Sequence, residues 1–290
     1  MRLGNHTGPT MTTAYADTAI AGDSTDEMAV RVWRDSSVRR SAPLVLHFHG
    51  GAFCGGSLDS CETVPELLAE AGAVVVSADY PLAPQHQFPF ALGSIFGVLK
   101  TLHKARAKWA GKSSQVFVAG EEAGGNLAAS LALISRDQNG PALGGQILLS
   151  PMLDPCMATR SVRGADAGPA GCRWADGWQQ YLGSPEKAAH PYAAPGGSSR
   201  LAGLPPALVV TAQDDPMRDE SLSYADRLQE SGVFVRKHVL AAPTGWPGAL
   251  SAGRSNSQTW SAALRNQFVQ FFADSAALLR GPASHHHVQA

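Results

Sequence analysis

The chain has 290 residues, hydrophobic residues make up 44% of it, and its formal net charge is -1. A chain of this length and composition can bury the core of one large globular domain or of two smaller ones. The near-zero charge provides no basic excess for nucleic acid or an anionic membrane surface, so we expect neither as a partner.

The two ends and the cysteines bear on the cellular compartment. Residues 1–26 are polar, are expected to be irregular and contain no apolar run of signal-peptide length. No stretch of about 18 apolar residues occurs, so the sequence predicts a cytoplasmic protein without a membrane span. The polar, histidine-containing tail over 281–290 is expected to be disordered and not a metal site. The four cysteines are Cys54, Cys61, Cys156 and Cys172, and none forms a C-x-x-C pair, so a zinc site is not expected. We expect free thiols, with two disulfides as the alternative.

Short apolar runs recur along the chain and are typical of strands covered on both faces of a parallel sheet. The predicted strands are residues 28–33, 44–49, 74–78, 116–119, 146–150, 207–211 and 234–240. Apolar residues spaced near 3.6 predict helices over 65–71, 91–108, 124–135, 218–230 and 259–279. This alternation indicates an α/β fold in which helices flank a central, mostly parallel sheet.

One region interrupts the alternation. Residues 155–199 are rich in Gly, Ala, Ser and Pro, with Trp174, Trp178 and Tyr181 at helical spacing. We expect these aromatic residues to form the packed core of a small insertion, whose position after a strand also suits a lid. The sequence shows no second domain, so residues 1–290 are predicted to form one.

Five segments carry specific motifs in a fixed order. They are residues 47–57 (HFHGGAFCGGS), 79–89 (DYPLAPQHQFP), 120–128 (GEEAGGNLA), 149–154 (LSPMLD) and 204–220 (LPPALVVTAQDDPMRDE). Together they resemble the hormone-sensitive-lipase-like carboxylesterases, a family of the α/β-hydrolase fold. The family's motifs are an H-G-G-G/A oxyanion loop, D-Y-R-L-A-P-E-H-x-F-P, a G-D-S-A-G-G-N-L-A nucleophile elbow and a segment bearing the catalytic acid. The second motif differs here, because Pro81 stands for the usual arginine.

The resemblance implies where the active-site parts lie. Asp215 holds the position of the acid that orients a catalytic histidine. The oxyanion hole is expected to form from backbone amides that stabilise negative charge on a reacting carbonyl oxygen. Its residues are Gly50, Gly51, Ala52 and Ala123. The implied activity is hydrolysis of short acyl esters without a metal or an organic cofactor. The implied partners are a small ester or carbonyl ligand and, by analogy with relatives that pair through a sheet edge, a second copy of the chain.

The two central reagents of this chemistry are replaced. Glu122 stands where the family has its serine, and Gly248 falls where it has its histidine. Removing a triad serine or histidine typically lowers kcat roughly a millionfold. His238 is a candidate for a relocated base, although it lies within a predicted strand. Cys54 offers another arrangement for residual hydrolysis, although a lone thiol is more often structural.

Three functions remain open from the sequence, and they leave enzyme status undecided. The first is an esterase-like hydrolase with a degenerate catalytic centre. The second is a small-ligand-binding or regulatory protein that keeps the pocket. The third is a lyase or isomerase in which Glu122 acts as a general base; a covalent role for Glu122 as nucleophile is less favoured, since no histidine stands ready.

The resemblance also predicts how Glu122 lies. Its carboxylate should accept a hydrogen bond from at least one amide among Gly51, Ala52 and Ala123, unless the side chain turns toward solvent. The adjoining helix N-terminus should lower the pKa of Glu122. Asp214, next to the acid position, is expected to be solvated.

Overall fold

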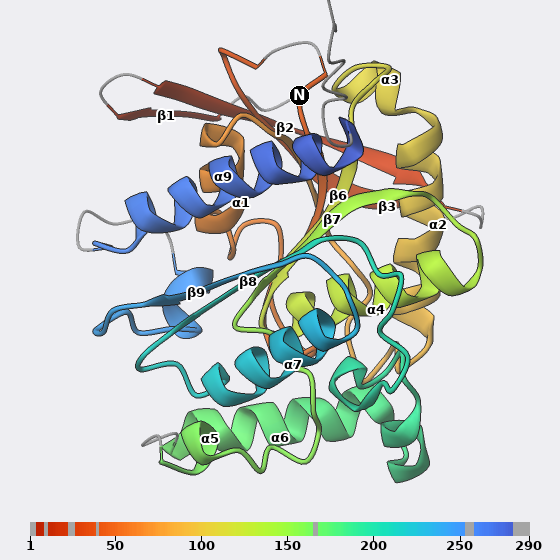
Figure 1. Ribbon diagram of the computed structural model, residues 1–290, viewed down its shortest axis with the longest axis vertical. Helices are drawn as coiled ribbons and strands as arrows, with labels where there is room; N and C mark the ends of the chain where they lie inside the picture. The colour runs from red at the N-terminus through yellow and green to blue at the C-terminus, as the bar shows by residue number, and fades with distance from the viewer. Residues whose placement is uncertain are drawn as a thin grey trace, which may run out of the picture.

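The computed structural model describes residues 4–8, 11–22, 27–38, 41–164, 168–252 and 258–280, with the backbone alone at 4–8, 11–12 and 168–172. Within these residues, nine strands form one sheet in the order β1-β2-β3-β5-β4-β6-β7-β8-β9 (Figure 1). The strands are β1 (Gly4–Gly8), β2 (Met11–Ala21), β3 (Glu27–Asp35), β4 (Leu44–Phe48), β5 (Val74–Ala78), β6 (Val116–Glu121), β7 (Leu143–Leu149), β8 (Ala207–Ala212) and β9 (Val235–Leu240). The predicted tail over 281–290 lies outside the described residues.

The strands from β5 to β9 in this order pair in parallel, which confirms the predicted mostly parallel sheet. Successive residues of a strand point to opposite faces. Leu44 and Leu46 therefore enter the core on one face, and Val45 enters the core on the other. The predicted pairing of two copies through a sheet edge stays a prediction.

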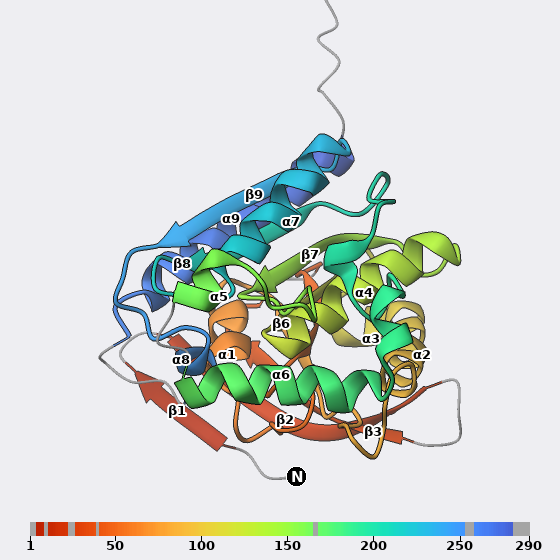
Figure 2. The same cartoon turned by 90° about the horizontal axis from the view of Figure 1, so that it is seen from below.

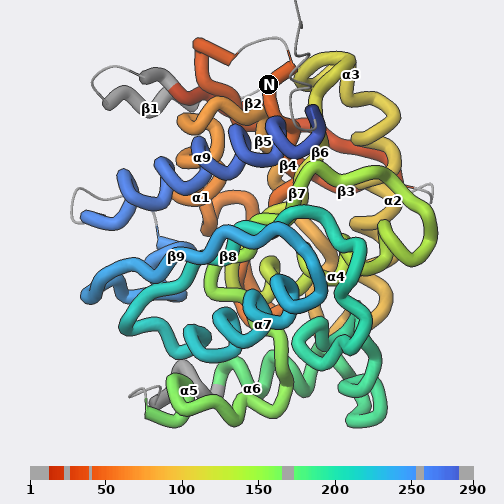
Figure 3. Tube along the Cα trace, viewed as in Figure 1, coloured from red at the N-terminus to blue at the C-terminus, as the bar shows by residue number. Residues whose placement is uncertain are grey.

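Helices cover both faces of the sheet, as an α/β fold requires. On one face α1 (Thr63–Glu70) lies beside α9 (Ser261–Arg280), which the chain trace also shows (Figure 3). The other face carries α2 (Phe90–Lys104), α4 (Ala123–Asp137) and α7 (Arg218–Glu230), with the four-residue α3 (Arg106–Trp109) following α2. None of the described helices is long and apolar enough to cross a bilayer.

The N-terminal part of the chain corrects one prediction. Residues 1–26 were expected to be irregular, but β1 and β2 form an antiparallel extension of the sheet beside β3. In β2 the side chains of Thr13 and Ile20 are buried, while Thr18 and Ala19 are exposed. Small and polar residues hide the strand in the sequence, because backbone pairing with β3 and not an apolar run defines it.

The predicted insertion over 155–199 holds α5 (Arg160–Gly164), α6 (Gly168–Leu182) and two short 3-10 helices, η1 (Pro185–Ala189) and η2 (Pro195–Gly197). Seen from below, α6 lies across the molecule beneath β6, with α5 and α8 (Gly248–Ser251) near one end of it (Figure 2). Trp174, Trp178 and Tyr181 are buried. The ring of Tyr181 stacks on that of Phe53, with the ring centroids 4.0 Å apart. The packed core of the insertion is therefore confirmed, whereas its opening as a lid and the single domain over 1–290 stay predictions.

Candidate functional site

The turn between β6 and α4 has the geometry of a nucleophile elbow. Glu122 occupies it with a φ of 53°, a left-handed conformation that residues with side chains rarely adopt. Glycines make the close approaches possible: a Cβ on Gly120 would lie 2.2 Å from the carbonyl oxygen of Gly124, and one on Gly124 would lie 2.0 Å from that of Phe48. Strained conformations of this kind concentrate at functional sites. The elbow is therefore intact around a residue that is not serine.

The glycine loop, residues 50–56 after β4, faces this elbow. Gly51 has a φ of 117°, and its carbonyl oxygen accepts hydrogen bonds from the amides of Cys54 and Gly55 at 3.0 and 2.9 Å. The carbonyl of Gly51 is thus turned back into the loop, and its amide faces the elbow. This orientation is what an oxyanion-binding loop needs.

The Glu122 carboxylate is buried and lies against the glycine loop. Its Oε2 accepts a hydrogen bond from the amide of Gly51 at 2.8 Å. Its Oε1 accepts one from the indole Nε1 of Trp174 at 2.5 Å and lies 3.5 Å from a guanidinium nitrogen of Arg173, both residues of α6. The prediction that the carboxylate would accept a hydrogen bond from a loop amide is confirmed at Gly51.

The pKa of Glu122 departs from the expectation. Burial raises its pKa above the ordinary value of a glutamate, although the Gly51 amide, Arg173 and Trp174 act in the opposite direction. The predicted lowering by the α4 N-terminus is wrong, because the Glu122 side chain makes no capping hydrogen bond to that helix. Its donors come from the glycine loop and from α6, and they do not offset the loss of water.

A second carboxylate takes the neighbouring amide of the loop. Glu121 is fully buried, and its Oε1 accepts a hydrogen bond from the amide of Gly50 at 3.2 Å. Its Oε2 lies 2.8 Å from Nε2 of His47, whose Nδ1 lies 3.1 Å from the hydroxyl of Ser77. Successive residues of the elbow therefore occupy successive amides of the glycine loop.

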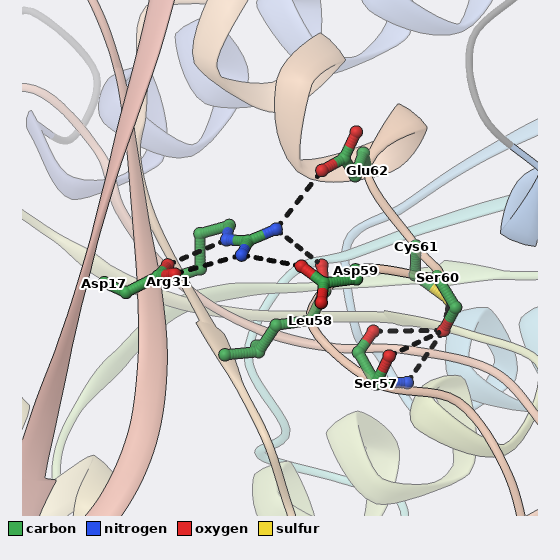
Figure 4. A network of polar contacts seen from close by, with 8 residues as sticks. All are labelled: Asp17, Arg31, Ser57, Leu58, Asp59, Ser60, Cys61 and Glu62. Atoms are coloured by element: carbon green, nitrogen blue, oxygen red, sulfur yellow. Dashed lines mark hydrogen bonds and ion pairs between the residues drawn. The ribbon is translucent and has the colours of Figure 1, made fainter. Parts of the chain in front are cut away.

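A cluster of polar contacts around Arg31 holds residues 58–62, which follow the glycine loop (Figure 4). Arg31 of β3 is buried and donates to both carboxylate oxygens of Asp17, at 2.8 and 3.0 Å. It also donates to Asp59 at 2.8 Å, to Glu62 at 3.2 Å and to the carbonyl of Leu58 at 3.1 Å. One guanidinium thus ties residues 58–62, between the glycine loop and α1, to the sheet.

Asp215 follows β8 at the same edge of the sheet and is buried. Its carboxylate accepts hydrogen bonds from the hydroxyl of Ser150 at 2.8 Å, the hydroxyl of Thr211 at 2.5 Å and the amide of Met217 at 2.9 Å. Burial raises the pKa of Asp215, and these three donors oppose the rise. The partners of the Asp215 carboxylate are therefore two hydroxyls and an amide, and no imidazole among the described residues contacts it.

Gly248 begins α8 and is exposed, and a Cβ placed on it would meet no atom within 4 Å. The preceding loop is held by Asp214, which accepts hydrogen bonds from the amides of Thr244 and Gly245 at 2.6 and 3.0 Å. Asp214 is exposed to solvent, as expected, and it also anchors the loop that presents Gly248. His238, the candidate relocated base, lies in β9 opposite Val210, as its strand pattern predicts.

Two cavities meet at this site. The Glu122 cavity has a volume of about 570 Å³ and is lined by Gly50, Gly51, Ala52, Cys54, Gly55, Gly56, Ser60, Cys61, Glu122, Arg173, Asp176, Gly177, Gln180, Gly248 and Ser251. The arginine cavity has a volume of about 770 Å³ and is lined by Arg160, Ser161, Gly164, Arg173, Trp174, Gln213, Asp214, Asp215, Pro216, Arg218, Gly245, Trp246, Pro247 and Gly248. No histidine is among these described lining residues. The two cavities share Arg173 and Gly248, so the predicted positions 122, 215 and 248 do come together, while Ala123 is buried at the start of α4.

The three cysteines whose side chains the structure describes show no sign of an activated thiol. Cys54, Cys61 and Cys156 are free, and the side chain of Cys172 lies outside the described residues. Burial raises the pKa of Cys54, and it raises the pKa of Cys61 to about 12. A raised pKa removes the thiolate that nucleophilic attack requires. In the part of the chain that the structure describes, no group of three or more His, Cys, Asp or Glu residues could hold a metal ion.

The sequence did not reveal four residues of this site. His47 and Glu121 lie 74 positions apart, and their pairing depends on β4 and β6 being neighbours in the sheet. Arg173 and Trp174 reach Glu122 from the insertion, whose packing over the elbow has no local signature. The one available signal was the pair of carboxylates at 121 and 122, since a buried carboxylate needs donors.

Comparison with known proteins finds relatives with the α/β-hydrolase fold. A family model described as alpha/beta hydrolase fold matches residues 45–243. Carboxylesterase NlhH of Mycobacterium tuberculosis is 34% identical over 222 residues, which are 73% of this chain and 69% of that protein. The gibberellin receptor GID1C of Arabidopsis thaliana is 34% identical over 213 residues, which are 70% of this chain and 62% of that protein.

Solved structures agree with this relationship. A thermostable esterase from Pseudomonas putida superposes with a TM-score of 0.79 at 28% identity, covering 89% of this chain and 82% of that one. The predicted resemblance to hormone-sensitive-lipase-like carboxylesterases is therefore confirmed. The chain belongs to the α/β-hydrolase fold family, among its carboxylesterase-like members.

Proposed function

We propose that this chain is a carboxylesterase-like protein that does not hydrolyse esters through an acyl-enzyme and instead binds a small molecule at the altered centre. The observation that carries the proposal is the Glu122 carboxylate on the amide of Gly51. A serine hydrolase needs that amide to receive the oxyanion of its substrate. Here the Glu122 side chain already accepts the hydrogen bond of that amide, so the amide is not free to receive a substrate oxyanion.

The other triad positions support the proposal. A carboxylate at the acid position acts by holding an imidazole in place. The Asp215 oxygens accept their hydrogen bonds from Ser150, Thr211 and Met217. With glycine at position 248, no side chain there relays a proton to or from position 122. Cytoplasmic location and a homodimer remain predictions that go with this function.

Retention of the pocket favours ligand binding over a purely structural role. Cavities of about 570 and 770 Å³ meet at the centre, within the range of about 300–1,000 Å³ usual for small-molecule sites. One relative is, by its name, a gibberellin receptor, so binding is a use to which this scaffold has been put.

A Glu122-dependent lyase or isomerase is the second candidate. The raised pKa of Glu122 favours it, because a general base works best when its pKa lies near the operating pH. The occupied Gly51 amide opposes it, since an enolate formed next to the base needs a free donor. Exchange of substrate α-protons in D₂O that is lost in Glu122→Gln would favour this candidate over ligand binding.

Steady-state hydrolysis of p-nitrophenyl acetate and butyrate tests the proposal, with carboxylesterase NlhH as the active control. We expect the release of p-nitrophenol to stay at the buffer background. Because enzymes typically turn over with a kcat of about 10 s⁻¹, a rate approaching that value would overturn the proposal.

A further inference from the structure

The arginine cavity differs in charge from the rest of the site. Three arginines line it, together with two aspartates and a set of largely apolar residues. The apolar lining residues are Trp174, Trp246, Pro216 and Pro247. Whether the cavity selects anions depends on which of these charges are already paired within the protein.

Both aspartates of the cavity are satisfied by the protein itself. The two oxygens of Asp214 accept hydrogen bonds from the hydroxyl and amide of Thr244 and from the amide of Gly245. The two oxygens of Asp215 accept from Ser150, Thr211 and Met217. Neither carboxylate is paired with an arginine of the cavity among the described contacts.

The arginines are satisfied to different degrees. Arg218 donates to Asp219 at 3.1 Å and to the carbonyl of Gln213 at 2.7 Å, so it is largely engaged. The side chain of Arg173 is 57% exposed and lies 3.5 Å from Glu122, beyond a good hydrogen bond, and its guanidinium carbon is 6.0 Å from the ring centroid of Trp174. Arg160 is exposed at the first residue of α5 and has no ion pair with any residue that the structure describes. A guanidinium offers five N–H donors, so Arg160 and Arg173 have donors to give to a ligand.

The geometry points to a carboxylate-binding site in the arginine cavity, in which Arg160 and Arg173 receive the carboxylate of a small organic acid and the apolar residues receive its hydrocarbon part. This inference rests on the proposed ligand-binding function and names its ligand class. Guanidinium groups match the planar, two-oxygen geometry of a carboxylate. Asp214 and Asp215 nearby favour a singly charged anion over a phosphate dianion.

The Glu122 contact connects this site to the centre. Arg173 lines both cavities and is the cation nearest to Glu122 among the described residues. A carboxylate that binds Arg173 in the arginine cavity competes with Glu122 for the same guanidinium. The side chain of Trp174, which lines the same cavity and donates to Glu122, reports on that change through its fluorescence.

Isothermal titration and tryptophan fluorescence of the purified full chain test the inference with hexanoate, octanoate and phenylacetate. Their primary amides, hexylamine and inorganic phosphate serve as probes that change the charge. We expect the acids to bind at least tenfold more tightly than the matched amides, and we expect hexylamine and phosphate to be the weakest ligands. Arg160→Gln and Arg173→Gln should each weaken the binding of acids roughly tenfold or more, because each removes a charge-assisted hydrogen bond.

Arg34→Gln is the matched control, since Arg34 is an exposed arginine on β3 and lines neither cavity. Its acid affinity should equal that of the wild type, and circular dichroism should show all three variants folded. Equal binding of acids and amides, a preference for phosphate or amine, or acid binding that survives both cavity variants would each overturn the inference. Those results leave the absence of ester turnover untouched, whereas hydrolysis of p-nitrophenyl esters would overturn the proposed function and not this charge preference.

Discussion

The Oε2 atom of Glu122 lies 2.8 Å from the amide nitrogen of Gly51, across the gap between the elbow and the glycine loop. A substrate oxyanion would have to take this hydrogen bond during serine-type hydrolysis. The neighbouring amide of Gly50 is taken in the same way by Glu121. Two adjacent carboxylates therefore hold the loop from one side, and their removal should alter both chemistry and stability in separable ways.

Restoring two residues should restore measurable esterase activity. Glu122→Ser alone should gain little, because a serine without a base stays protonated and weak. Adding Gly248→His supplies that base, and a Cβ added at Gly248 meets no atom within 4 Å. We expect the double variant to hydrolyse p-nitrophenyl butyrate at least tenfold faster than either single variant.

Asp215→Asn in this double variant is the control for a working triad. It should remove most of the gain, because the imidazole would lose the carboxylate that orients it. Full activity from Glu122→Ser alone would reveal a base elsewhere and contradict the role assigned to position 248.

Glu220 should make the protein less stable as pH rises. It is buried in α7 and accepts a hydrogen bond from the amide of Leu153 at 3.4 Å, and burial raises its pKa well above the ordinary value. When the folded-state pKa of an acid exceeds its unfolded value, the unfolded state releases its proton first. Stability is then lost as pH rises from the unfolded pKa toward the folded one.

Glu220→Gln should remove this pH dependence. The variant and the wild type should melt at similar temperatures near pH 4, and the variant should melt about 2–4 °C or more higher at pH 8. Glu230→Gln, an exposed change on the same helix, is the matched control and should show no such trend. Differential scanning calorimetry across this range would refute the account if the two curves stayed parallel.

The buried contact between His47 and Glu121 should respond to hydrogen bonding more than to charge. Glu121→Ala leaves the Nε2 atom of His47 and the Gly50 amide without their partner, and we expect it to lower the free energy of unfolding by about 3–5 kcal/mol. Glu121→Gln keeps an acceptor for Gly50 and presents an N–H donor to His47, so its loss should be under about 1 kcal/mol. Urea denaturation measures both; equal losses would mean that the negative charge itself is required.

Arg31 should stabilise the region between the glycine loop and α1. Arg31→Met leaves Asp17, Asp59 and Glu62 without their shared cation, and we expect a loss of about 2–3 kcal/mol in the free energy of unfolding. Arg34→Met, on an exposed side chain of the same strand, should change it by less than about 0.5 kcal/mol. Comparable losses in the two variants would show that the cluster of Figure 4 adds little.

The sequence predicted the strands from β3 to β9 because their apolar runs are dense and bounded by turn residues. It also predicted α7 with the bounds that the structure has, Arg218–Glu230, from the spacing of apolar residues. It failed at β2, where buried and exposed positions do not separate into apolar and polar residues. A strand of that kind is defined by the backbone of its neighbour.

The site was predictable in its backbone and less so in its electrostatics. The resemblance of residues 120–128 to the family's motif predicted the elbow, and Gly120 and Gly124 permit it because few other residues fit such close approaches. The raised pKa of Glu122 was missed because it depends on how completely Trp174 and its neighbours exclude water, which one sequence does not reveal. The hydrogen bonds of Asp214 were missed because they require the loop at 244–245 to return to the end of β8, a contact between residues distant in the sequence.

Intact-mass spectrometry after treatment with a fluorophosphonate tests the central claim, that this centre does not form a covalent acyl-enzyme, most directly. The reagent phosphonylates an activated serine at the elbow, so the Glu122→Ser, Gly248→His double variant serves as the positive control. We predict that the wild-type protein keeps its unmodified mass under conditions that label the double variant, and that excess p-nitrophenyl butyrate leaves no acyl adduct on it. Stoichiometric labelling of the wild type, with the added mass mapped to a residue lining the Glu122 cavity, would contradict the account.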